Sequence, residues 1–383
     1  MKKWVQRVAC FMLLITLWAG WFTLTVKASS YVQTSGTHFV LNNHPFYFAG
    51  TNNYYFHYKS KKMVDAVFDD MKAMDLKVIR IWGFHDGTPQ ENSVLQSRPG
   101  VYEESGFQKL DYAIYKAGQE GIKLVIPLVN NWDDFGGMNQ YVKWFQAGSH
   151  DHFYTDSRIK TAYKNYVRYV LERTNTYSGV QYKDDPAIMT WELANEPRAQ
   201  SDPSGDILVN WADEMSAWIK SIDSNHLVAV GDEGFFRMTG HDDWFYNGGE
   251  GVDWDRLTAL PHIDYGTYHL YPDHWNQSAA WGVKWIKDHI TGGNAIGKPV
   301  VLEEFGYQNQ AARPDVYDSW LKTIEQLGGA GSQFWILTSI QDDDSLYPDY
   351  DGFRVLKESR EAGIIREHAK RMNEKKLMKN ACL

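Results

Sequence analysis

From Ile188 to Arg198 the chain reads IMTWELANEPR, an apolar run that ends abruptly in amide, acidic and basic side chains. A short apolar run of this length is typical of a strand buried on both faces of a parallel sheet. Polar side chains at its end are typical of the place where parallel sheets carry their chemistry. The stretch therefore predicts a buried strand with functional groups, Asn195 and Glu196 among them, at its carboxyl end.

The same pattern recurs along the chain, and helical periodicity separates the apolar runs. Eight parallel strands with intervening helices close most naturally into a single α/β domain, a (β/α)₈ TIM barrel with elaborated loops at the C-terminal face. A doubly wound open sheet is the structural alternative. The expected strands are Phe46–Gly50, Val78–Trp82, Leu124–Val129, Ile188–Leu193, Leu227–Val230, Ile263–Tyr268, Val300–Glu304 and Gln333–Leu337.

The two ends of the chain differ from the rest. Three basic residues within the first seven precede an apolar run from Val8 to Val26, which predicts a signal peptide over residues 1–28. We therefore expect a secreted, extracellular protein, with an uncleaved membrane anchor as the alternative. Because no linker or repeat follows, residues 29–373 are expected to form one catalytic domain, and residues 374–383 a Lys-rich tail.

The composition restricts the class of ligand. The 383 residues carry a formal net charge of -9, which argues against nucleic acid as a partner. Of the two cysteines, Cys10 lies in the leader and Cys382 near the other end, so we expect no intramolecular disulfide. Aromatic residues make up 15% of the chain, and their flat rings suit the C–H faces of sugars. We expect a polysaccharide substrate, a monomer and no stable protein partner.

Polar and aromatic side chains stand where the expected strands end. Glu196 and one of the adjacent acids Glu303 and Glu304 would face each other across a barrel mouth, and a glycosidic bond is cleaved by such a pair of carboxyl groups. Paired carboxylates hold a divalent metal in other proteins, but His269 alone adds little to such a site, so we expect no metal and no cofactor. The other candidates are Arg80, Trp82, Asn130, Trp132, Asn195, Arg198, Tyr271 and Trp335.

The ordered motifs resemble glycoside hydrolase family 5, and more closely its subfamily 7 endo-β-1,4-mannanases. The likeness extends from about Tyr31 to Phe353, and its specificity comes from the whole ordered set. The motifs are Ile79-Arg80-Ile81-Trp82, Val129-Asn130-Asn131-Trp132, Asp134-Phe135-Gly136-Gly137, Ala194-Asn195-Glu196-Pro197-Arg198, Glu304-Phe305-Gly306 and Asp349-Tyr350-Asp351-Gly352-Phe353.

The resemblance implies a role for each candidate. Glu196 would be the acid/base and Glu304 the nucleophile, although alternation along a strand leaves Glu303 open from the sequence alone. Arg80 beside Glu304 would keep that carboxylate ionised, whereas Glu196, with less positive charge nearby, would hold its proton longer. The implied substrate contacts are Asn195 to a sugar 2-hydroxyl, Trp335 beneath the ring, Arg80, His269 and Tyr271 around the nucleophile, and Trp132 and Arg198 against neighbouring sugars.

The expected function is that of an endo-β-1,4-mannanase, which cuts mannan, glucomannan or galactomannan by a retaining double displacement. A retaining β-1,4-glucanase and an exo-acting β-mannosidase are alternatives within the same chemistry, and transglycosylation is a further outcome of it. A barrel that binds polysaccharide without cleaving it is the alternative from another class. The presence of both acids argues against that last alternative.

Overall fold

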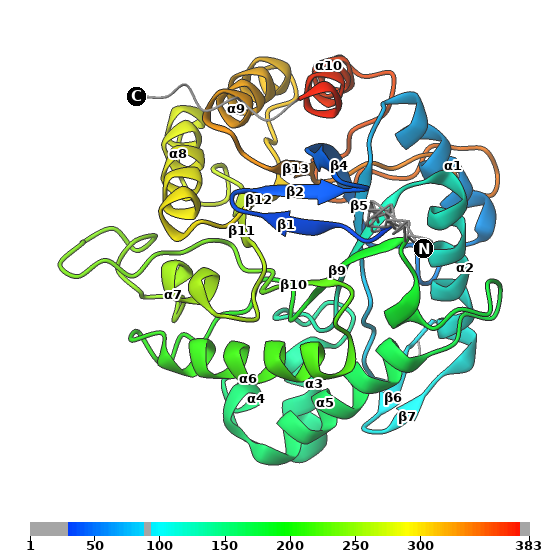
Figure 1. Cartoon of the computed structure of the whole chain (residues 1–383), viewed down its shortest axis with the longest axis vertical. Coiled ribbons are helices and arrows are strands. Elements are labelled where there is room, and N and C mark those ends of the chain that lie inside the picture. The colour runs from blue at the N-terminus through cyan, green and yellow to red at the C-terminus, as the bar shows by residue number, and fades with distance from the viewer. Residues whose placement is uncertain (1–29, 88–92, 376–383) are drawn as a thin grey trace, which may run out of the picture.

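The computed structural model describes residues 30–87 and 93–375 (Figure 1). The expected signal peptide, including its alternative as an anchor, lies outside these residues, and so does the tail beyond Lys375. Within the described part, no helix has both the length and the apolar character that crossing a membrane requires.

Eight parallel strands form the barrel that the sequence predicts. Their order is β10-β9-β8-β5-β4-β13-β12-β11, so the first barrel strand pairs with the last, as closure requires. At the edges of this sheet the backbone N–H of Asp264 donates to the carbonyl of Val228 at 2.8 Å and joins the β10 and β11 sides. The bounds are β4 (Phe48–Asn53), β5 (Val78–Ile81), β8 (Lys123–Pro127), β9 (Ile188–Glu192), β10 (Leu227–Ala229), β11 (Gly266–Leu270), β12 (Val300–Phe305) and β13 (Gly331–Phe334).

Helices surround the barrel, and each strand is followed by at least one of them (Figure 1). Serines begin three helices by accepting a hydrogen bond from a backbone N–H in the first turn: Ser60 for α1, Ser278 for α8 and Ser359 for α10. The bounds are α1 (Lys61–Ala73), α2 (Glu104–Glu120), α3 (Gly137–Phe145), α4 (His152–Thr155), α5 (Ser157–Glu172), α6 (Asp206–Ile222), α7 (Trp254–Ala259), α8 (Ala279–Ile296), α9 (Arg313–Leu327) and α10 (Arg360–Glu374).

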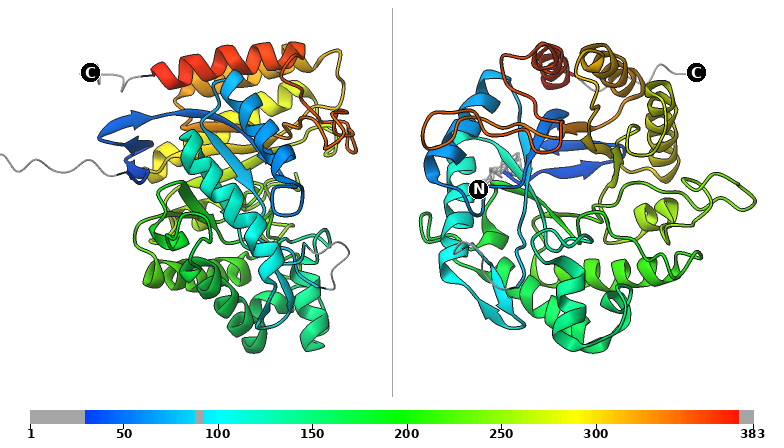
Figure 2. Two further views of the ribbon diagram at one scale, coloured as in Figure 1. Left: turned by 90° about the vertical axis from the view of Figure 1, so that its right-hand side faces the viewer. Right: turned by 180° about the vertical axis from the view of Figure 1, so that it is seen from behind.

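An antiparallel hairpin sheet closes one end of the barrel, and the sequence patterns did not predict it. It consists of β1 (Gln33–Ser35), β2 (His38–Leu41) and β3 (His44–Phe46), so the expected first strand is shared between β3 and β4. Buried Val32 and Phe39 pack with the inward side chains at the strands' amino ends, such as Val78 and Val125. Figure 2 (left) places this sheet at one end and the loop after β13 at the other. The opposite, carboxyl-terminal end is left for the site.

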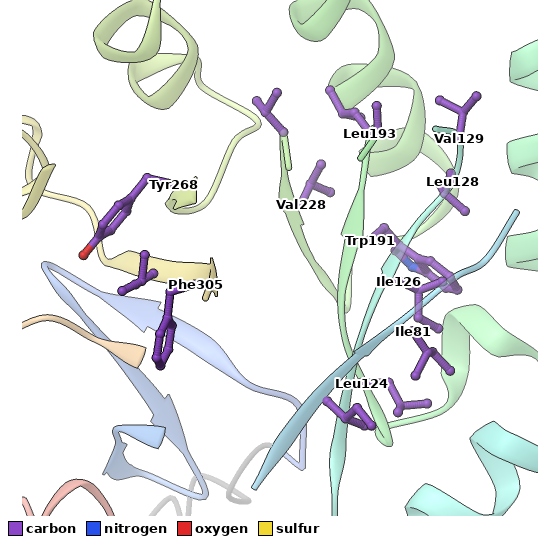
Figure 3. Close-up of a cluster of buried hydrophobic side chains, with 14 of the residues drawn as sticks. Ile81, Leu124, Ile126, Leu128, Val129, Trp191, Leu193, Val228, Tyr268 and Phe305 are labelled. Carbon is purple, nitrogen blue, oxygen red and sulfur yellow. The ribbon is translucent and has the colours of Figure 1, made fainter. Parts of the chain in front are cut away.

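Alternation along the strands separates the outer core from the barrel interior. On β5, Ile79 and Ile81 pack into the outer hydrophobic layer, whereas Arg80 between them contacts acids of β9 and β12 inside the barrel. Figure 3 shows part of the outer layer, with Ile126 of β8 beside Trp191 of β9. The helices therefore bury the apolar faces, and the interior is free for charged groups near the mouth.

Candidate active site

A cleft of about 850 Å³ lies at the carboxyl ends of the barrel strands. Nine of the eleven candidate residues line it, and the other two, Arg80 and His269, are fully buried behind the cleft wall. The structure therefore brings together every candidate in one place. The nine lining residues are Trp82, Asn130, Trp132, Asn195, Glu196, Arg198, Tyr271, Glu304 and Trp335.

Glu304, the second-last residue of β12, is held by two donors. Arg80 Nη1 donates to its Oε1 at 2.5 Å, and the Tyr271 hydroxyl donates to its Oε2 at 2.7 Å. Only 5% of the residue is exposed. Burial raises the pKa of the Glu304 carboxyl above its ordinary value, and the charges of His269 and Arg80 oppose that rise only in part.

A β-bulge explains why both adjacent acids of β12 face the interior. Tyr268 pairs with Leu302 and His269 pairs with Glu304, so Glu303 is an extra residue on that strand. As a result Glu303 Oε2 lies 3.6 Å from Arg80 Nε, on the same guanidinium that binds Glu304. Simple alternation would have turned one of the two acids into the helix layer.

Glu196 follows β9 in a left-handed backbone conformation, with a φ of 51°. Its Oε1 lies 2.7 Å from His269 Nδ1, and its Oε2 accepts a hydrogen bond from Trp132 Nε1 at 2.5 Å. Burial would raise the pKa of Glu196, but His269 and Trp132 outweigh it and lower that pKa to about 2. The carboxyl group is thereby oriented from both sides.

The expected distribution of charge between the two acids is wrong for this structure. Glu304 has the raised pKa and Glu196 the lowered one, the reverse of the expectation from Arg80 alone. The reason is that Arg80 is shared with the buried acids Glu192 and Glu303. His269, whose pKa is raised by the surrounding carboxylates in spite of its burial, brings a second positive charge to Glu196.

Two asparagines connect Arg80 to the cleft. Arg80 Nη2 donates to Asn195 Oδ1 at 2.9 Å, and Asn195 Nδ2 donates to Asn130 Oδ1 at 2.9 Å. Asn130 Nδ2 in turn donates to the carbonyl of Asp134 at 3.0 Å. Because an amide nitrogen carries two hydrogens, Asn195 keeps one donor for a ligand in the cleft.

Aromatic rings line one side of the cleft. The ring of Trp335, directly after β13, lies 5.9 Å from that of Tyr54 and 5.8 Å from that of Trp82, measured between centroids. Trp335 Nε1 donates to Asp351 Oδ2 at 2.7 Å, which fixes the indole plane. The peptide bond between Trp335 and Ile336 is cis. This surface suits the apolar face of a sugar ring.

Arg198, another lining residue, is held by two acids. It donates to both oxygens of Glu233, at 2.7 and 2.8 Å, and to Glu250 Oε2 at 2.7 Å. Its guanidinium lies 5.1 Å from the centre of the Trp132 ring. Burial, followed by the nearby charge of Glu196, raises the pKa of Glu233 to about 7. Arg198 and Trp132 thus form a charged and an aromatic part of the cleft lining that contact each other.

Ten lining residues were not among the candidates, although five of them, Asp134, Phe135, Tyr350, Asp351 and Phe353, stand in motifs that carry the resemblance. Tyr54 follows β4 directly and had the same signal as the chosen candidates, namely a position at a strand end. The others come from long loops, where sequence position says little about distance to the mouth. They are Asp134, Phe135, Glu233, Trp244, His274, Trp275, Tyr350, Asp351 and Phe353.

The metal alternative has a geometric counterpart. Among the described residues, Glu196, His269 and Glu304 form the one group of acids and histidines whose ligand atoms lie within 4.8 Å of one another. The Arg80 guanidinium, however, already occupies one oxygen of Glu304 and Tyr271 the other. The site therefore has a built-in cation, the Arg80 guanidinium, in contact with one of its acids.

Comparisons with known proteins cover most of the chain. A family profile described as GH family 5 beta-mannosidase-like matches residues 29–326. Mannan endo-1,4-beta-mannosidase A from Podospora anserina is 38% identical over 320 residues, 80% of this chain and 82% of that protein. The structure of an endo-beta-1,4-mannanase from Thermotoga petrophila matches with a TM-score of 0.83 and 49% identity, over 87% of this chain and 78% of the other. The structure of an endo-1,4-beta-mannanase from Rhizomucor miehei matches with a TM-score of 0.85 and 41% identity, over 90% of this chain and 100% of the other.

Proposed function

This chain belongs to the β-mannosidase-like group of glycoside hydrolase family 5, and on that premise we propose that it is a secreted endo-β-1,4-mannanase. Its substrates would be mannan, glucomannan or galactomannan, and its products would keep the β-configuration. The names of the relatives support the activity, and the basic and apolar leader of the sequence supports export.

One observation carries the proposed mechanism. A carboxyl oxygen of Glu196 lies within 4.8 Å of one of Glu304. Retaining glycosidases hold their two carboxyl groups about 5–5.5 Å apart, whereas inverting enzymes need about 6.5–9.5 Å to admit a water molecule. The spacing therefore supports double displacement over a single inversion.

In the first step Glu304 attacks the anomeric carbon and forms an ester, while the bond to the departing oxygen breaks and Glu196 gives that oxygen the proton that it shares with His269. The hydrogen bonds from Arg80 and Tyr271 to Glu304 hold the attacking carboxylate in place. In the second step Glu196 takes a proton from water, which attacks the same carbon and releases Glu304. A sugar hydroxyl in place of water gives transglycosylation.

The cleft offers more than one surface to a sugar chain. Trp335, Trp82 and Tyr54 form one group of lining residues, and Trp132 with Arg198 forms a second. Two such groups support the binding of several sugars at once, as an endo mode requires.

The test compares soluble galactomannan with carboxymethyl cellulose. We expect a rapid fall in viscosity with mannan for few reducing ends released, and β-mannose as the first anomer seen by NMR. Cleavage of the glucan only, mannose alone as the first product, or an α-anomer would each contradict one part of the proposal. Because Arg80 supplies the cation in the site, we expect hydrolysis to survive EDTA, and its loss would restore the metal alternative.

A further inference from the structure

A second pair of acids lies behind the first, deeper in the barrel. Glu192 ends β9 and Glu303 is the bulge residue of β12, and both side chains are fully buried. Arg80 Nε donates to Glu192 Oε2 at 2.7 Å and lies 3.6 Å from Glu303 Oε2. The cleft residues described above do not include either acid, so the substrate does not contact them.

If both acids of this pair are ionised, their oxygens have too few hydrogen-bond donors. Glu192 Oε1 and both oxygens of Glu303 are buried without a donor among the described residues. A buried carboxylate without partners is costly, and two of them beside one guanidinium are more so. The two carboxyl groups face the same Arg80 Nε, Glu192 Oε2 at 2.7 Å and Glu303 Oε2 at 3.6 Å. One proton between them would supply the missing donor and remove one charge.

His269 links this buried pair to the acid/base. Its Nδ1 lies 2.7 Å from Glu196 Oε1, and its Nε2, on the far side of the ring, lies 3.5 Å from Glu303 Oε2. The Nε2 atom is also buried without another partner in the described part of the chain. The imidazole therefore stands between the cleft acid Glu196 and the interior acid Glu303.

We propose that Glu192 carries the proton of the buried pair, that Glu303 carries its charge, and that this charge keeps His269 protonated and aimed at Glu196. Glu192 and Glu303 are positioning residues, and they act on the reaction through His269. The inference rests on the proposed function in that Glu196 must deliver a proton. Glu303 Oε2 lies between two cations, 3.6 Å from Arg80 Nε and 3.5 Å from His269 Nε2, whereas of these two Glu192 contacts Arg80 alone. The raised pKa of Glu192 and the lowered pKa of Glu303 agree with this division.

The surroundings of His269 allow the sign of the effect to be derived. Acids outnumber cations around the ring, so a protonated ring is favoured. The activity is lost at high pH when the His269–Glu196 pair gives up its shared proton, and a negative charge at position 303 delays that loss. The groups that face the ring or its partners are Glu196, Asp232, Glu233, Glu303, Glu304, Tyr265, Tyr271, Arg80 and Arg198.

The sharpest test compares two isosteric variants, Glu303→Gln and Glu192→Gln. The pH profile of kcat/KM is measured with mannohexaose. Without the charge at 303, the basic limb moves to lower pH by about one unit or more, because an opposite charge within a few ångströms has gone. In Glu192→Gln the amide donates to Glu303 as the protonated acid does, so the limb moves by less than about half a unit. Equal shifts in both variants, or none in Glu303→Gln, would overturn the proposal.

A control and a second readout separate this inference from the proposed function. Glu325→Gln removes the carboxylate partner of another buried histidine, His368, and leaves the basic limb in place. NMR titration of ¹⁵N-labelled histidine, with His269 assigned from His269→Asn, needs no turnover and no folded Glu303 variant. We expect wild-type His269 to be protonated at pH 7, and a neutral ring there refutes the inference even if mannan is hydrolysed.

Discussion

Two histidine–carboxylate pairs in this molecule have nearly the same hydrogen bond and opposite shifts of the histidine pKa. In the barrel, His269 Nδ1 lies 2.7 Å from Glu196 Oε1; between α9 and α10, His368 Nδ1 lies 2.6 Å from Glu325 Oε1. Both rings are fully buried. Yet the pKa of His269 is raised well above the ordinary value, and that of His368 is lowered.

The difference comes from the charges around each ring, and at His269 Glu304 is the largest of those that raise the pKa, followed by Glu196 and Glu303. The far nitrogen of His269 faces the acid Glu303, whereas that of His368 lies 2.9 Å from the neutral hydroxyl of Ser332. Burial lowers the pKa of both histidines, and Arg371 and Lys375 add to this at His368. A close carboxylate alone therefore does not charge a buried histidine; the sum of the surrounding charges does.

The largest effect on activity is expected from the loss of Glu304, an acid that lies beside the His269–Glu196 pair, whereas the His368–Glu325 pair has no part in the proposed reaction. Glu304→Ala should lower kcat by at least about 10⁴-fold, because no other group can form the ester, while mannan affinity is kept. Glu325→Gln serves as the matched control, with the rate of the wild type. Mannohexaose turnover and equilibrium binding measure both. Hydrolysis by Glu304→Ala at the wild-type rate would remove the assigned nucleophile.

An intermediate effect comes from the same substitution in both pairs. Asparagine keeps a donor near the place of Nδ1 but carries no charge. We expect His269→Asn to lower kcat by about 10²–10⁴-fold, the usual contribution of acid–base catalysis. His368→Asn should keep kcat and lose about 1–3 kcal/mol of stability with its bond to Ser332. Steady-state kinetics and thermal unfolding check the two; similar activity losses would show that charge is not what distinguishes the rings.

The smallest expected effect is a change in the pKa of His368 that makes the His368–Glu325 pair more like the His269–Glu196 pair. Arg371 lies beside Glu325, donates to both of its oxygens and lowers the pKa of His368. Arg371→Gln removes that cation, so the pKa of His368 should rise, by less than about one unit for a partly exposed charge. NMR titration of His368 measures the shift. A fall in the pKa would contradict the argument that summed charge sets the state of the ring.

Much of the barrel follows from local pattern. The apolar runs that became β5, β8, β9, β10 and β12 are marked by branched side chains, and their expected ends differ by at most two residues from those observed. The last strand was expected too late because Gly331-Ser332-Gln333 carries little apolar signal. Phe46 was assigned to the barrel because a hairpin partner cannot be distinguished from a barrel strand by composition.

The site was predictable where position at a strand end determines the contact, as for Arg80, Trp335 and Tyr271. It was not predictable where the contact depends on pairing. The charge on Glu196 depends on His269, 73 positions away, and that of Glu304 depends on how Arg80 is divided among three acids. Residues such as Glu233 and Asp351 enter the cleft from loops, whose paths the periodicity of the sequence does not describe.

Because β12 contains a bulge, the number of residues in this strand determines which of its side chains face the barrel interior. A strand shows its residues alternately inward and outward, and one inserted residue changes the parity of everything after it. Here the change places Glu303 and Glu304 on the same side. A deletion of one residue within β12 would leave the composition almost unchanged and would still turn an acidic side chain into the outer hydrophobic layer. For an engineer, spacing on this strand is as strict a constraint as residue type.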